Sequence, residues 1–245
     1  MDALNANTYS PKVRVGNWVE ENVLIEDKLN EFQRKRMNGE LLSQKQQSTN
    51  LALLSPTTLS TSTDGFVHFG DLVQIRNENN GAPVMMSASN DITASKNTDP
   101  IARNTYKITP VGSSQIGDVL RFEQQFCFCL ASEGSDRYVN SDIAGLFNTK
   151  KSRTQPLTLD EAISYNSQWH VLCKDPPSRI ETEGMPVPIN CEVVITHSKT
   201  NNNLSFLENF MVGTSFGKEF EMTAKSEYDS HHAERQCNLW KFIEN

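Results

Sequence analysis

A weak threefold repeat in the strand pattern is the feature that most limits how this chain can fold. Each repeat opens with a turn residue, an acid and an apolar strand. These openers lie at residues 70–76, 117–122 and, more loosely, 190–197. Each repeat closes on a polar residue followed by an aromatic strand, at residues 104–108, 167–171 and 238–243. Short strands bounded by Asn, Gly, Asp and Pro dominate after Asp64, so the fold class is all-β.

Three such units predict a β-trefoil, because the aromatic residues of equivalent strands fill one shared core that no single repeat buries alone. The closing aromatics Tyr106, Trp169 and Trp240 are the candidates for that core. We expect the second strand of each unit at residues 83–86, 126–130 and 204–206. A β-sandwich is the competing all-β fold.

The first 64 residues have a different pattern. Ile25, Leu29 and Phe32 recur at i, i+4 and i+7, with acids before them and bases after them. This pattern predicts one amphipathic helix over about residues 20–39, ending at Gly39. Residues 43–64 are rich in Gln, Ser, Thr and Asn, which indicates an extended linker. We therefore predict an N-terminal arm over 1–64 and a trefoil domain over 65–245.

Charge and composition exclude several classes of protein. Thirty acidic against 23 basic residues give a net charge of −7, which removes the attraction that dominates binding to nucleic acid or to an anionic membrane. The sequence has no apolar run long enough to span a membrane and no signal peptide at its start. Five cysteines without a CxxC pair do not suggest a disulfide framework. We expect a cytoplasmic protein.

We expect no enzyme, no cofactor and no metal, because the sequence contains neither HExxH nor a P-loop. His231 and His232 are adjacent, and neighbouring side chains on an extended chain point to opposite faces, which favours a turn facing solvent or a partner. Cys127 and Cys129 share one face of a strand, where we expect them to pack as small apolar groups.

Several long strings resemble the cilia- and flagella-associated protein 161 family. They include VRVGNW at 13–18, DGFVHFGD at 64–71, PIARNTY at 100–106, EGMPVP at 183–188, FGKE at 216–219 and YDSHH at 228–232. The resemblance implies a globular part similar to the MIR-type β-trefoil. It also implies a structural microtubule inner protein of the cilium or flagellum axoneme, bound to the luminal wall of doublet microtubules, where it stabilises the axoneme and supports motility.

The implied partners are tubulin, on the luminal face of its lattice, and other microtubule inner proteins. Candidate contacts in the arm are Trp18 paired with Arg14, because a Trp with an Arg is a common interface anchor. The run Arg34, Lys35 and Arg36 is either a solvated helix end or a contact with acidic tubulin.

The turn that contains His231 and His232 completes the set of candidate partner-binding residues. The alternative to a partner contact for Trp18 is that it docks on the trefoil of its own chain. The alternative function is a cytosolic trefoil module that binds a glycan or another ligand.

Overall fold

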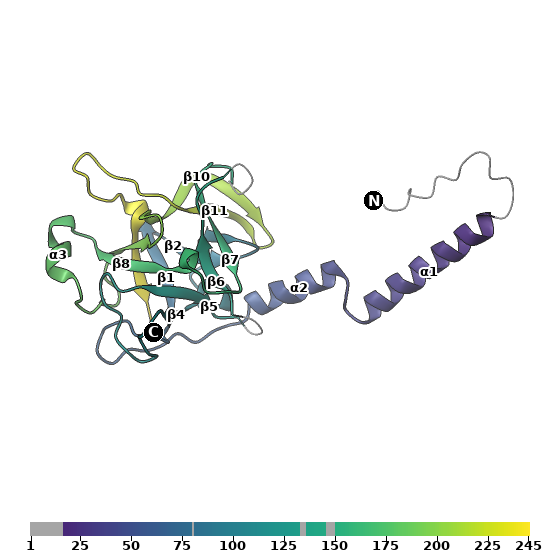
Figure 1. Ribbon diagram of the computed structural model, residues 1–245, viewed down its shortest axis with the longest axis horizontal. Coiled ribbons are helices and arrows are strands. Elements are labelled where there is room, and N and C mark those ends of the chain that lie inside the picture. The colour runs from purple at the N-terminus through teal and green to yellow at the C-terminus, as the bar shows by residue number, and fades with distance from the viewer. Residues whose placement is uncertain (1–16, 80, 133–135, 146–149) are drawn as a thin grey trace. The chain divides into compact units, whose positions relative to one another are not determined.

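The chain divides into two compact units, Met1–Thr49 and Asn50–Asn245 (Figure 1). The computed structural model describes residues 17–79, 81–132, 136–145 and 150–245. Arg14, one of the candidate partner contacts, lies outside these described residues.

Helix α1, Asn17–Met37, is the main element of the first unit and matches the amphipathic helix predicted over about 20–39. The chain leaves it through Gly39, whose φ of 71° is the left-handed value expected of a residue that ends a helix. The backbone N–H of Glu40 donates to the carbonyl of Lys35, which satisfies one of the last helical acceptors.

A second helix, α2, spans Leu42–Leu53, where the sequence analysis predicted an extended linker. That prediction was wrong for this half of the segment. Gln, Lys, Leu and Ala are good helix formers, and the hydroxyls of Ser48 and Thr49 donate to the carbonyl of Lys45 within the helix. Polar composition alone therefore did not distinguish a solvated helix from an extended chain.

Strands make up most of the second unit, and the described residues contain twelve of them. The first four are β1 (Leu72–Asn79), β2 (Ala82–Ala88), β3 (Ile92–Ser95) and β4 (Tyr106–Pro110). The next four are β5 (Phe126–Leu130), β6 (Tyr138–Ser141), β7 (Gln155–Asp160) and β8 (Trp169–Cys173). The last four are β9 (Val193–His197), β10 (Leu204–Thr214), β11 (Gly217–Ala224) and β12 (Leu239–Ile243). A short helix, α3 (Arg179–Thr182), follows β8.

The strands close into a barrel rather than forming two open sheets. Antiparallel pairing runs from β1 to β4, β5, β8, β9 and β12, and β12 pairs again with β1. A sandwich has free edges on both of its sheets, so this closure contradicts the β-sandwich alternative. The strands β2–β3, β6–β7 and β10–β11 pair as hairpins outside this ring.

Three segments between the strands bond to one another in a cycle. The N–H of Val67 donates to Val187 (3.0 Å), that of Leu120 to Val67 (2.8 Å), and that of Val187 to Leu120 (2.9 Å). All three side chains are buried. One contact thus occurs three times around the barrel.

A tight turn follows each of these segments and bonds to a closing strand. The backbone N–H of Gly70 donates to the carbonyl of Ile108 (2.7 Å), that of Glu123 to Val171 (2.9 Å), and that of Asn190 to Phe242 (3.0 Å). The three donor residues have φ values of 102°, 69° and 59°. These positions fix how the three repeats correspond.

The closing elements lie where the sequence placed them. A short 3₁₀ helix precedes each: η2 (Ala102–Asn104), η3 (Tyr165–Ser167) and η5 (Gln236–Asn238). Tyr106, Trp169 and Trp240 then occupy matching positions and are fully buried. The prediction that both tryptophans belong to the core is confirmed.

The second opening element was assigned wrongly. Residues 117–122 precede the turn at Glu123 and form only bridges, and the first strand of that unit is β5, which we had predicted as a second strand. Gly117 and Asp118 imitate Gly70 and Asp71 in sequence, whereas the true equivalent of Gly70 is Glu123. The predicted second strands β2 and β10 are present.

An extended strap follows α2 and lies against the barrel. Leu53 is buried in the core, the N–H of Thr57 donates to Pro100, and the N–H of Ser60 donates to Leu72. At the carboxyl end, the N–H of Asn245 donates to the carbonyl of Ser60 (3.1 Å). The strap, residues 54–64, therefore belongs with the barrel unit by its hydrogen bonds.

The hairpin of β10 and β11 is the longest in the barrel unit, and it crosses between repeats. Strand β11 pairs with β3 at Phe220 and with β7 at Thr223. Strand β10 lies at the end of this strand order. Its exposed side borders the cleft described below.

Candidate functional site

The predicted basic contacts lie in the last turn of α1. Lys35 pairs with Glu31 at 2.9 Å, and its hydrogen bond lowers the pKa of that carboxyl. Arg34 and Arg36 are exposed, with no ion pair to any residue that the structure describes. Positive side chains at a helix carboxyl end are favourable for the helix itself, and these two also remain free to meet an acidic partner.

The apolar face of α1 is exposed. Ile25, Leu29 and Phe32 each keep about half of their surface accessible, at 47%, 54% and 49%. Trp18 lies in the first turn of the same helix, seven residues before Ile25. An apolar stripe left uncovered in this way is typical of a surface that packs against a partner.

His231 and His232 lie in a turn closed by the bridge between Tyr228 and Glu234. Asp229 shapes this turn, because its carboxylate accepts from the N–H groups of Ala233 and His231, and these bonds lower its pKa. Both imidazoles are exposed. No group of His, Cys, Asp and Glu within the described residues is arranged to hold a metal ion.

Two of the cysteines, Cys127 and Cys129, lie in settings that suppress thiolate chemistry. Cys127 and Cys129 pack with Tyr138 in a small cluster, on the opposite face of β5 from Phe126 and Phe128, as predicted. Burial raises the pKa of each of these two thiols to about 11. They behave as small apolar groups at neutral pH.

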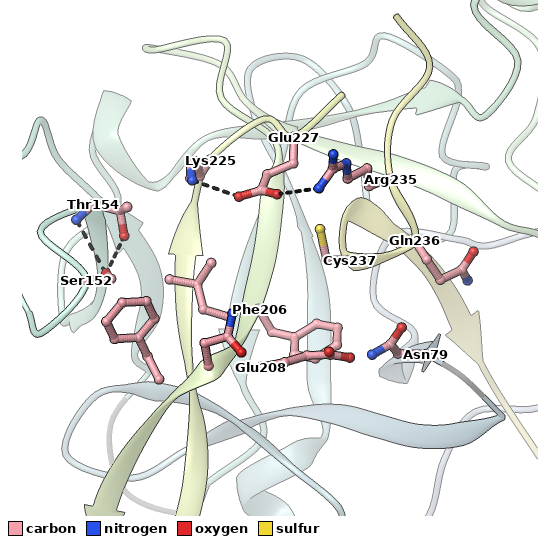
Figure 2. A pocket seen from close by; sticks show the side chains of 13 residues that line it. Asn79, Ser152, Thr154, Phe206, Glu208, Lys225, Glu227, Arg235, Gln236 and Cys237 are labelled. Carbon is pink, nitrogen blue, oxygen red and sulfur yellow. Dashed lines mark hydrogen bonds and ion pairs between the residues drawn. The ribbon is translucent and has the colours of Figure 1, made fainter. Parts of the chain in front are cut away.

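A cleft of about 760 Å³ opens beside β10 (Figure 2). Phe206 and Glu208 of β10 lie on one side of it, and Lys225, Glu227 and Arg235 lie on the opposite side. Its ends are formed by Ser152 with Thr154 and by Asn79 with Gln236 (Figure 2).

The charged side of the cleft is a linked trio. The Nζ of Lys225 lies 2.7 Å from Glu227, and the guanidinium of Arg235 lies 3.7 Å from the other oxygen of the same carboxylate. Cys237 lies below them, and burial raises its pKa. The sequence analysis did not find this cleft, because its lining comes from five separate stretches of chain.

A buried ion pair ties β11 to the first repeat. Arg103 donates to Glu219 at 2.6 Å and to the carbonyl of Ala88, and its guanidinium stacks over the ring of Phe216. Thr93 donates to the second oxygen of the same carboxylate. With these partners the pair is satisfied and acts as a structural link.

A carboxyl cluster holds the strap to the end of β12. Glu244 accepts from the N–H of Ser62 at 2.8 Å, and Asp71 accepts from the N–H of His68 at 2.7 Å. Burial and the neighbouring Asp71 raise the pKa of Glu244 to about 7. The sequence gave no sign of this pairing, because its members lie at opposite ends of the barrel unit's sequence.

Among solved structures, an SDF2-like protein from Arabidopsis thaliana shares this fold. The TM-score is 0.56 at 11% identity, covering 73% of this chain and 95% of that one. At that identity the likeness concerns the fold alone.

Sequence comparison identifies the family. The model of the cilia- and flagella-associated protein 161-like domain matches residues 83–245. The cilia- and flagella-associated proteins 161 of Danio rerio and Mus musculus are 37% and 34% identical to this chain, each across 97% of it and 88% of the relative. The chain belongs to the cilia- and flagella-associated protein 161 family, and is therefore a cilium- and flagellum-associated protein. Within the described residues, no helix is long and apolar enough to cross a membrane.

Proposed function

We propose that this protein is a non-catalytic structural component of the axoneme, bound inside doublet microtubules to the luminal wall. It contacts tubulin and neighbouring inner proteins, stabilises the doublet and so supports ciliary motility. The observation that carries the proposal is the family match along 97% of the chain.

The arm supplies the physical argument for lattice contact. A polypeptide of this length with little to bury cannot offset its ordering entropy of roughly 1 kcal/mol or more per residue without a partner. The uncovered stripe Ile25, Leu29 and Phe32 offers apolar area, and Arg34 and Arg36 offer charge toward acidic tubulin. Trp18 and Arg14 extend the same contact in this proposal.

We further propose that the barrel unit is a β-trefoil. Its support is the cycle of bonds among Val67, Leu120 and Val187, the three matched turns, and the three buried closing aromatics. In this arrangement six strands form the barrel and three hairpins cap one end of it.

The arm is tested with matched variants of the full chain in cells that lack the endogenous protein. One variant replaces Ile25, Leu29 and Phe32 with Ser, and the control replaces Val19 and Val23, which are equally exposed but lie outside that stripe, with Ser as well. We expect wild type and control in isolated doublets and the first variant largely absent. A second variant lacks residues 1–49 and keeps Leu53 and the strap. We expect this variant to unfold cooperatively in solution but not to incorporate into doublets.

Three results separate the hypotheses. Absence of the wild type from isolated doublets contradicts the luminal role. Normal incorporation of the triple variant shows that the arm is not the anchor. Micromolar binding of a soluble sugar, together with absence from doublets, favours the alternative ligand-binding module.

A further inference from the structure

We propose that a small hollow at the end of the β10–β11 hairpin anchors a partner protein by one large apolar side chain that carboxylates flank. The hollow belongs to the barrel unit, so this binding does not depend on whether the arm contacts the lattice.

Two walls form the hollow. One wall is the chain at residues 94–97, where β3 ends, and the other is the end of the hairpin, at Met211, Phe216 and residues 218–220. The space between them is about 190 Å³. Pockets for drug-sized ligands usually have about 300 Å³ or more, so this hollow is sized for a single side chain.

The 3₁₀ helix η2 holds both walls in place. Arg103 fastens the hairpin, because it bonds to Glu219 and stacks on the ring of Phe216. Asn104, the next residue, fastens the other wall by donating to the carbonyl of Asn97 at 3.3 Å. The hollow is therefore formed before a partner arrives, which lowers the entropy cost of binding.

Apolar groups make up much of the lining. Met211 keeps 43% of its surface exposed, and the rings of Phe216 and Phe220 are partly exposed. Binding energy at protein interfaces concentrates in a few large side chains that fill such hollows. The lining therefore favours a large apolar side chain as the anchor.

The exposed charges of the lining are positive. Lys96 and Lys218 line the hollow, and neither has an ion pair among the residues that the structure describes. The Nζ of Lys96 lies 5.5 Å from the centre of the Phe220 ring, so this cation is close to the apolar surface. Glu219 is the one acid among the described residues of the lining, and it is 5% exposed and already paired with Arg103.

Strand register brings the two lysines toward each other. Phe220 lies opposite Ala94 where β11 pairs with β3, and two residues further along the two chains are Lys218 and Lys96. Like charges at facing positions of neighbouring strands repel each other. A partner carboxylate relieves this repulsion and adds an attraction, whereas a basic partner adds a further like charge. Charge therefore selects an acidic surround for the apolar anchor.

The test is an NMR titration of the full chain with three blocked pentapeptides, Glu-Glu-Leu-Glu-Glu, Glu-Glu-Ala-Glu-Glu and Lys-Lys-Leu-Lys-Lys. We expect the acidic Leu peptide to shift the amides of residues 95–97 and 216–220. It should bind about fivefold more tightly than the Ala peptide, which lacks the anchor, and about tenfold more tightly than the Lys peptide, which reverses the charge.

Two variants separate the charge from the apolar contact. The double variant Lys96→Gln and Lys218→Gln should bind the acidic Leu peptide about tenfold more weakly, and Met211→Ser about threefold more weakly. The control, Lys45→Gln with Lys174→Gln, removes the same charge at exposed positions that do not line the hollow and should bind like wild type.

Three outcomes overturn the proposal: binding of the Ala or the Lys peptide as tight as that of the acidic Leu peptide, shifts confined to residues outside the hollow, or no shift at millimolar peptide. Because Lys96 and Lys218 are exposed, the double variant should retain the wild-type spectrum away from the hollow. If it does not fold, Met211→Ser decides, and unchanged binding of the acidic Leu peptide by that variant overturns the proposal.

Discussion

Replacing Glu244 with Gln should make the protein more stable at neutral and alkaline pH. Its side chain is half-buried, accepts from the N–H of Ser62 and faces the carboxyl of Asp71. Burial first, and then Asp71, raise its pKa from 4.5 to about 7. The folded protein thus holds this proton more tightly than the unfolded chain does. The stabilisation that the protonated Glu244 carboxyl gives to the folded state is fully present below pH 4.5. It falls as the pH rises and is lost above about pH 7.

The size of this change in stability follows from the rise in the pKa of Glu244 from 4.5 to about 7. At about 1.4 kcal/mol for each tenfold change in proton affinity, the ceiling is about 3 kcal/mol. Partial exposure screens the charge, so we expect about 1 to 2 kcal/mol. Gln keeps an acceptor for Ser62 but carries no charge, and its contribution is constant with pH.

Urea denaturation at pH 5, 6, 7 and 8 measures this difference. The stability of wild type relative to Glu244→Gln should fall by about 1 to 2 kcal/mol between pH 5 and pH 8. Glu183→Gln, at an exposed acid without an ion pair among the described residues, should track wild type at every pH. Parallel pH profiles for wild type and Glu244→Gln would refute the reasoning.

Three further substitutions test the packing, each by urea denaturation at pH 7. Trp240→Ala should cost about 3 to 5 kcal/mol, because the ring is fully buried and its N–H donates to the carbonyl of Leu204 at 2.9 Å; a loss below 1 kcal/mol would contradict its place in the core. Arg103→Met should cost about 3 to 5 kcal/mol by leaving Glu219 buried without its cation, and adding Glu219→Gln should recover part of the loss; simple additivity of the two changes would argue against the pair. Gly70→Ala should cost about 1 to 2 kcal/mol from its φ of 102°, since the neighbouring side chain, the exposed Ile116, can move aside; no loss would mean that the turn relaxes.

The sequence predicted the closing strands because their signal is local. Tyr106, Trp169 and Trp240 each lie two residues after a polar residue, and large aromatics are conspicuous in a chain with three tryptophans. The second opener failed for the converse reason. The turn at Glu123 has a φ of 69°, yet Glu carries no sequence signal for a left-handed residue, while Gly117 supplies a false one.

The cleft and the carboxyl cluster were beyond prediction from sequence for a different reason. Each assembles side chains that are distant in the chain, as Ser62 and Glu244 illustrate. Their proximity depends on the register of strands that pair only after the barrel closes. Helix α2 was missed because a single buried residue, Leu53, anchors it, and one apolar position sets no period.

The closing aromatics of the three repeats differ in their hydrogen bonds. In the second and third repeats the closing tryptophan donates its N–H to a carbonyl of the unit's second strand, from Trp169 to Val139 and from Trp240 to Leu204. The first repeat has Tyr106 at this position, with its buried hydroxyl unpartnered in the described part of the chain, and the ion pair of Arg103 with Glu219 joins this repeat to β11 instead.

That link accounts for the long hairpin. Because β11 is fastened to the first repeat by Glu219 and to the second by Thr223, β10 and β11 extend beyond their own unit. The break in β10 pairing, at residues 208–210, lines the same cleft as Arg235. The departure from symmetry therefore places the break in β10 and the linked trio Lys225, Glu227 and Arg235 in one cleft.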